Sequence, residues 1–210
     1  MENSLILLAA SIGFFHTLFG LDHYVPFIAM SKANKWSLTK TALVTLICGT
    51  VHVLSSVFIG IFGIWFGLNV LKLEAIESFR GRFASWLLIL FGIIYFIWAI
   101  RELIKDKTNY KESILSNKKL FWTLFIIFIL GPCEPLIPIL MFPALINSFT
   151  LAVVVTLVFY IVTISTMLGI VMAASYGLNL ISFKGINRFV HVIASTTICF
   201  CGLTIKFLGI

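Results

Sequence analysis

Long apolar stretches, separated by short polar segments, run through the whole chain. Six of them are long enough to cross a hydrocarbon core of about 30 Å, which takes roughly 20 residues of helix. They cover residues 5–30, 41–68, 84–103, 120–145, 149–175 and 187–208. We therefore predict an all-α integral membrane protein with six transmembrane helices.

The composition agrees with this pattern. Hydrophobic residues make up 60% of the 210 residues, charged residues make up 11%, and the mean hydropathy is +1.11. A soluble domain carries about a quarter charged residues, so that class is excluded. The first stretch has neither a basic flank nor a small-residue cleavage pattern. We expect it to stay in the protein as the first helix and not to be removed as a signal peptide.

The basic residues are distributed by side of the membrane. With six spans, the connections after the first, third and fifth share one side and hold eleven of the 15 Lys and Arg residues. Lys72, Arg80, Arg82 and Lys206 fall on the other side. The positive-inside rule places the first side in the cytoplasm and both termini outside. We expect a multi-pass protein of the plasma (inner) membrane, with the lipid bilayer as its partner and no nucleic-acid role.

The chain also repeats itself. The charged segment 104–119, predicted to be a cytoplasmic linker, separates two blocks of three spans, 1–103 and 120–210. An offset of 111 residues places Gly20 on Gly131. Because each block holds three spans, the second block must enter the membrane from the opposite side. Many secondary transporters are built from such inverted repeats, and we predict two inverted three-helix repeats here.

Helix-breaking residues fall at equivalent places in the two blocks. Span four contains four prolines within residues 132–143, and span one contains Gly20 and Pro26. Proline lacks an amide hydrogen and its ring clashes with a carbonyl one turn earlier. Non-helical backbone at bilayer depth is tolerated where it lines a cavity or is buried in protein. We predict that helices one and four are broken and that both breaks line one polar cavity.

Two carboxylates lie deep within apolar stretches, Asp22 in span one and Glu134 in span four. We assign the other six acidic residues to the amino terminus or to charged connections. An ionisable group at bilayer depth costs a few kcal/mol, and it marks a functional site by default.

Histidines accompany these carboxylates. His16 and His23 share a helical face, and His52 lies inside the second stretch. Imidazole nitrogen combined with carboxylate oxygen suits divalent nickel, cobalt, zinc or copper. The predicted metal ligands are His16, Asp22, His23, His52, Cys133 and Glu134. The predicted substrate path includes Ser55, Pro135, Pro138, Thr163 and Thr166.

Structural roles for the same residues stay open at this point. A buried histidine can bond a carbonyl of a neighbouring helix, and Asp22 with His23 can form an internal ion pair that fixes helix packing. Glu134 can be protonated and structural. Cys133 is equally a small apolar filler. All four cysteines lie in apolar stretches, so no secreted-type disulfide framework is indicated.

The segment from His16 to His23, followed by Gly49 to His52, resembles the NicO-type nickel/cobalt transporters. These have a His-(x)n-Asp-His motif in an early helix and a Gly-x-x-His motif in the next. The Gly-x-Asp-His string is also similar to the HupE/UreJ proteins. The six-span layout with two breaks is similar to the superfamily of LysE-type exporters, UreH-like proteins and DsbD/CcdA-type thiol-reductant conductors. The resemblance implies metal-binding roles for the three histidines and Asp22.

Two departures from these patterns are visible. The usual nickel motif has four residues between His and Asp, whereas five separate His16 from Asp22. Reductant conductors carry a cysteine at each helix break. Here Cys133 stands at the second break, and Asp22 with His23 occupies the first. A two-cysteine relay at the breaks is therefore missing.

The sequence predicts a secondary transporter, and not an enzyme, that moves a divalent transition metal, nickel or cobalt first. The metal is the transported substrate, and no permanently bound cofactor is expected. Its ligands must be deprotonated to bind, so coupling to protons is the expected mechanism. The alternatives are a thiol-redox conductor using Cys133 with Cys48, and an exporter of a small organic or sulfur-containing solute. An intramembrane enzyme and a homo-oligomer also stay open.

Overall fold

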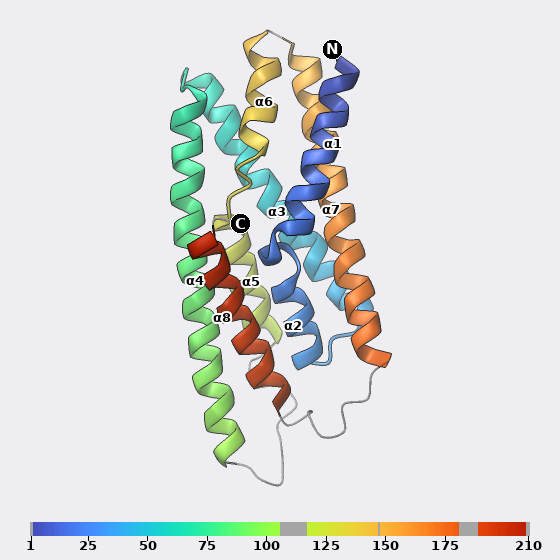
Figure 1. Cartoon of the computed structure of the whole chain (residues 1–210), viewed down its shortest axis with the longest axis vertical. Coiled ribbons are helices and arrows are strands. Elements are labelled where there is room, and N and C mark those ends of the chain that lie inside the picture. Colours follow the sequence, from blue (N-terminus) through green and yellow to red (C-terminus); the bar gives the residue numbers. More distant parts are fainter. Residues whose placement is uncertain (1, 106–116, 147, 181–188, 209–210) are drawn as a thin grey trace.

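The computed structural model describes residues 2–105, 117–146, 148–180 and 189–208, and helices dominate these ranges (Figure 1). Five helices are long and apolar enough to cross a membrane within the described part of the chain. These five are α1 (Glu2–Phe19), α3 (Leu38–Trp65), α4 (Val70–Lys105), α7 (Phe149–Leu180) and α8 (Val190–Leu208). The prediction of an all-α, multi-pass membrane protein is confirmed at this level.

Two of the predicted spans are broken into shorter helices. Stretch 5–30 forms α1, the 3-10 turn η1 (Leu21–His23) and α2 (Val25–Ala33). Stretch 120–145 forms α5 (Asn117–Leu130) and α6 (Leu136–Leu145). Proline explains where the second halves start. Pro26 lies in the first turn of α2, where a missing amide hydrogen costs nothing, and α6 begins directly after Pro135. The predicted breaks are confirmed.

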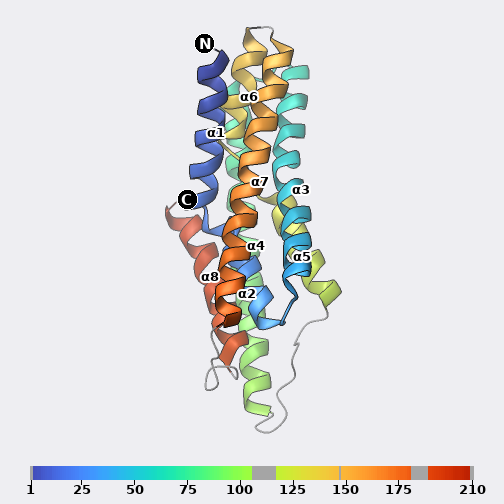
Figure 2. The same cartoon turned by 90° about the vertical axis from the view of Figure 1, so that its right-hand side faces the viewer.

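The broken segments run in opposite directions through the molecule. In Figure 1, α1 descends from the amino terminus and α2 continues toward the lower end, whereas α5 ascends and α6 continues to the upper end. Helix α1 packs along α7, and α4 packs along α8. Figure 2 shows α1 and α7 side by side over much of their length. The two breaks therefore lie at middle height, enclosed by the long helices.

Three apolar clusters hold the described helices together, and the smallest of them joins α4 and α6 through Leu73, Ile137 and Met141. The first joins α2, α3, α4, α5, α7 and α8 and includes the fully buried Phe27 and Tyr95. The second joins α1, α3, α7 and the second break and includes Ala9, Phe159 and Cys133. Many large apolar side chains face outward from the helices. Such a surface suits lipid, in which helices associate mainly through close packing and polar contacts.

Helix α4 corrects the assignment of charged residues. It begins at Val70, well before the start of the predicted span at residue 84, so Glu77 and Arg80 belong to a helix and not to a connection. Glu77 is 0% exposed. The interpretation that only Asp22 and Glu134 lie deep in the protein is therefore wrong. Arg80, one turn further along α4, forms an ion pair with Glu77 and so neutralises its buried charge. Of the predicted linker 104–119, both ends are helical, and residues 106–116 lie outside the described ranges.

Candidate metal centre

Three histidines from three separate elements meet beside the first break. His16 comes from the end of α1, His23 from η1 and His52 from the middle of α3. Their candidate ligand nitrogens all lie within 4.8 Å of one another. The ring centroids of His16 and His23 are 4.6 Å apart, and those of His23 and His52 are 5.0 Å apart. The break after α1 brings His23 back against His16 and toward α3.

Hydrogen bonds fix the orientation of two of these rings. Nδ1 of His23 lies 3.0 Å from Asp22 Oδ1 and 3.2 Å from the Gly20 carbonyl oxygen. Nδ1 of His52 lies 3.3 Å from the Phe128 carbonyl oxygen. The carbonyls can only accept, so Nδ1 carries the hydrogen in each ring and donates it. In a neutral ring this leaves Nε2 with a free lone pair.

The remaining nitrogens of these rings have no hydrogen-bond partner within the described part of the chain. Nε2 of His23 and Nε2 of His52 are buried and make no hydrogen bond, and both side chains are only 2% exposed. Buried polar atoms are almost always hydrogen-bonded. Metal-binding imidazoles typically hold one nitrogen on a carbonyl or carboxylate and present the other to the metal. The two histidines show this arrangement.

Asp22 supports the cluster through His23. Its carboxylate pairs with the His23 ring and is 27% exposed, and the group of mutually close ligand atoms contains the three histidines without it. Asp22 was predicted to be a direct ligand. The structure shows that its carboxylate accepts a hydrogen bond from His23, and direct ligation by Asp22 stays a prediction.

The second break places its two predicted ligands differently. Cys133 is fully buried, and its Sγ lies 3.8 Å from Nε2 of His16. Glu134 is exposed and is not a member of the histidine group. These neighbouring residues therefore differ in burial across the non-helical segment. The break brings the thiol to the edge of the cluster, whereas the carboxylate stays on the cavity wall.

A cavity of about 620 Å³ lies beside the histidines and the two helix breaks. Its wall includes all three histidines, Asp22 and Glu134, and it extends to Arg82 of α4 and Lys206 of α8. Both breaks therefore line one cavity, as predicted, but most of its wall is apolar. Among the predicted path residues, Pro135 lines the cavity, whereas Ser55, Pro138, Thr163 and Thr166 do not.

Glycine lies close to a candidate ligand at both break positions aligned by the sequence repeat. A Cβ on Gly20 would collide with the ring of His23 and lie 2.9 Å from the His16 carbonyl oxygen. A Cβ on Gly131 would lie 3.0 Å from Nδ1 of His52. At each break the backbone approaches a candidate ligand so closely that any side chain must displace it.

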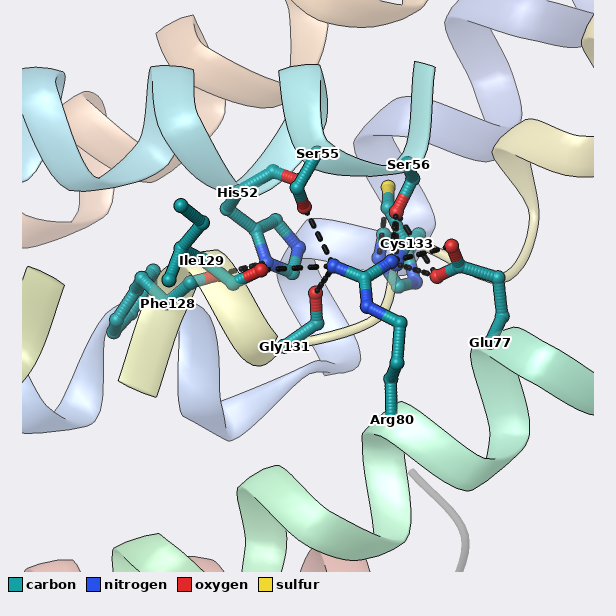
Figure 3. A network of polar contacts seen from close by, with 10 residues as sticks. His52, Ser55, Ser56, Glu77, Arg80, Phe128, Ile129, Gly131 and Cys133 are labelled. Atoms are coloured by element: carbon teal, nitrogen blue, oxygen red, sulfur yellow. Dashed lines mark hydrogen bonds and ion pairs between the residues drawn. The ribbon is translucent and has the colours of Figure 1, made fainter. Parts of the chain in front are cut away.

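Side chains from α3 and α4 hold the second break in place (Figure 3). Arg80 donates to the carbonyl oxygens of Ile129 at 2.8 Å and Gly131 at 3.2 Å. It also donates to Oγ of Ser55 at 2.7 Å and forms an ion pair with Glu77. Arginine has five N–H donors in a rigid fork, which suits a site where several carbonyls need a partner.

Glu77 completes the network on the other side of the break. Its Oε2 accepts from Oγ of Ser56 at 2.9 Å and from the Cys133 amide at 3.1 Å. The same amide lies 3.0 Å from Oγ of Ser56. Backbone groups at membrane depth have no water to bond, and these side chains supply the missing partners.

Sequence reasoning missed both charged residues of this network, Glu77 and Arg80. Their i, i+3 spacing within a continuous helical stretch was the signal that would have placed them on one face.

The second cysteine of the redox alternative lies elsewhere. Cys48 is buried in the first apolar cluster, whereas Cys133 belongs to the second, and both are free thiols. The structure thus does not join the two thiols into a disulfide.

A comparison with known proteins finds no family model, curated protein or solved structure that matches this chain. A functional conclusion therefore depends on the geometry of the site.

Proposed function

We propose that this protein is a secondary transporter of a transition-metal ion, with His16, His23 and His52 as its central ligands. The observation that supports this most directly is the pair of buried, unpartnered Nε2 atoms on His23 and His52. In both rings Nδ1 donates a hydrogen bond to an oxygen acceptor. Both rings belong to the histidine cluster on the wall of a large cavity. Imidazole suits zinc, copper, iron and nickel. Nickel or cobalt as the substrate is suggested by the NicO resemblance.

The proposed architecture is two inverted three-helix repeats, in which α1 with α2, and α5 with α6, each count as one broken span. The helix contacts support this pairing. The α1 contact with α7 has a counterpart in α5 with α3, and the α2 contact with α7 has one in α6 with α3. The opposite directions of the broken spans in Figure 1 agree with such a symmetry. Transporters of this type bind substrate where broken helices meet near the midplane.

Proton coupling follows from the ligand chemistry in this proposal. Imidazoles bind a metal only in their unprotonated form, so protons and metal compete for the same nitrogens. A metal ion that enters from one side is released where protons are more abundant. The inferred membrane orientation keeps both termini outside, because most basic residues lie at connections on the opposite side.

The test is metal flux in proteoliposomes containing the purified full chain. We expect saturable uptake of at least one of nickel, cobalt, zinc and copper, and its loss in His23→Ala and His52→Ala. His191→Ala is the matched control, because this buried histidine bonds Tyr95 outside the cluster. Folding of each variant is checked by size-exclusion chromatography and circular dichroism. Unchanged flux in both folded cluster variants, or no flux of any of the four metals in the wild type, would overturn the proposal.

A further inference from the structure

We infer that the thiol of Cys133 is the fourth ligand of the histidine cluster, which makes the site selective for thiophilic ions of the zinc and copper class. This inference rests on the proposed metal-binding function and narrows its substrate. It moves the expected preference away from nickel and cobalt. Thiolate ligands favour zinc and monovalent copper, and imidazole suits both metals as well.

The spacing between the thiol and the nearest histidine fits joint coordination. Sγ of Cys133 lies 3.8 Å from Nε2 of His16. For a tetrahedral zinc ion with bonds of roughly 2.0–2.1 Å to nitrogen and about 2.3 Å to sulfur, two such ligands lie roughly 3.5 Å apart. Relative to His16, the thiol therefore needs to move by only a few tenths of an ångström. Cys133 lies outside the group of ligand atoms that are within 4.8 Å of one another, so joint coordination with all three histidines requires a further approach of the second break. Three histidines and one cysteine would close the coordination shell of four.

Charge balance points to the same ligand. Three neutral imidazoles contribute no charge, and Asp22 is the carboxylate that is hydrogen-bonded to the cluster. The charge of Glu77 is matched by Arg80, and Glu134 is exposed. A divalent ion would thus keep one uncompensated positive charge inside the membrane. When the Cys133 S–H bond is replaced by a sulfur–metal bond, the proton leaves to water in the cavity, and the thiolate neutralises that charge.

The protein fixes the backbone that carries this thiol. The Cys133 amide donates to Ser56 Oγ and to Glu77 Oε2, and Arg80 holds the adjacent Gly131 carbonyl (Figure 3). Glu77 and Arg80 are therefore positioning residues, since they contact the break and not the ion.

The test is the absorption spectrum of the full-length protein in detergent with Co²⁺ alone as the probe. A thiolate ligand adds a near-ultraviolet sulfur-to-cobalt charge-transfer band to the visible d–d bands that any tetrahedral site gives. We expect both features in the wild type. Cys133→Ser should lose the near-ultraviolet band and keep the d–d bands. Cys199→Ser, a partly buried cysteine outside the cluster, should keep both.

The outcomes separate this inference from the proposed function. Visible d–d bands without a charge-transfer band in the wild type overturn the thiol ligand and leave the histidine site standing. The absence of any cobalt spectrum overturns both. A band that persists in folded Cys133→Ser assigns the thiolate to another cysteine and also rejects the inference.

Competition between metals tests the selectivity. We expect Cys133→Ser to weaken Zn²⁺ binding at least tenfold more than Ni²⁺ binding. Glu77→Gln should weaken Zn²⁺ binding by about 10–100-fold, as outer-shell changes typically do, and reduce the charge-transfer band. Glu74→Gln, one turn earlier on α4, is its control. Equal losses for both metals in Cys133→Ser would contradict the proposed selectivity.

Discussion

The two helix breaks satisfy their backbone groups in different ways. The first break, between α1 and α2, is largely self-contained. The Gly20 amide donates to the His16 carbonyl, the His23 amide donates to the Gly20 carbonyl, and a 3-10 turn fills the gap. Its own side chains then supply the chemistry, with Asp22 oriented toward His23. One short segment, from His16 to His23, therefore contains both the helix break and two of the candidate metal ligands.

The second break depends on side chains from other helices. Carbonyls before it accept from Arg80 and His52, and the Cys133 amide donates to Glu77 and Ser56. The first break can therefore be recognised from its local sequence. The second is recognisable as an interruption, but its supporting partners lie 49 to 77 residues away in the chain. Equivalent positions in a repeat thus do not imply equivalent means of stabilisation.

The largest expected effect comes from removing the external support of the second break. Arg80→Ala leaves Glu77 buried without its partner and frees the carbonyls that Arg80 holds. Breaking a buried ion pair from one side costs about 3–5 kcal/mol. We expect a loss of that size in the free energy of unfolding, measured by denaturant titration in detergent. Lys72→Ala, an exposed position on the same helix, is the control.

A double variant sharpens this result. In Glu77→Leu combined with Arg80→Leu, no buried charge is left unpaired, so we expect part of the stability to return. Stability that falls further in the double variant would show that the carbonyl contacts of Arg80, and not the ion pair, hold the break.

Asp22→Asn tests the self-contained break with a smaller effect. Asparagine keeps an acceptor for Nδ1 of His23 but removes the negative charge. We expect metal affinity, measured by isothermal titration, to fall by about 10–100-fold, with stability unchanged within about 1 kcal/mol. Wild-type affinity in this variant would show that Asp22 does not tune His23.

Substitution of the two aligned glycines compares the two breaks directly through the free energy of unfolding. Overpacking typically costs about 1–3 kcal/mol. We expect Gly20→Ala to fall in the upper part of that range, because the new methyl group meets both the His23 ring and a backbone carbonyl. Gly131→Ala should fall in the lower part, because its nearest neighbour lies 3.0 Å away on a side chain. Thermal unfolding of both variants gives the ranking, and the reverse order would contradict the difference between the breaks.

Much of the arrangement follows from the sequence. Apolar length predicted a helical membrane protein, proline and glycine predicted both breaks, and the histidines at His16, His23 and His52 do meet. The contact of Asp22 with His23 was not predicted as its main role, because ligation and orientation of a neighbouring histidine need the same residue at the same spacing. Glu134 was predicted to lie deep in the protein but is exposed. Burial within a non-helical segment depends on backbone angles, which the periodicity of a sequence does not encode.

The support of the second break escaped prediction for another reason. Glu77 and Arg80 lower the hydropathy of their segment, so a window of apolar length ends the span before it reaches them. Their charges cancel each other through an i, i+3 contact within α4, whereas their contacts with the second break follow from how α3, α4 and α5 pack. Paired charges on one helical face are therefore evidence for a buried network even where the average hydropathy indicates a loop.

The segment on either side of Gly131 contacts two of the three histidines of the candidate metal centre. The Phe128 carbonyl before it steers the His52 ring, and the Cys133 sulfur after it approaches His16. A change in the angle between α5 and α6 would therefore shift Cys133 relative to the carbonyl that holds His52. In the proposed transporter, this one hinge would set the spacing between two of the candidate ligands.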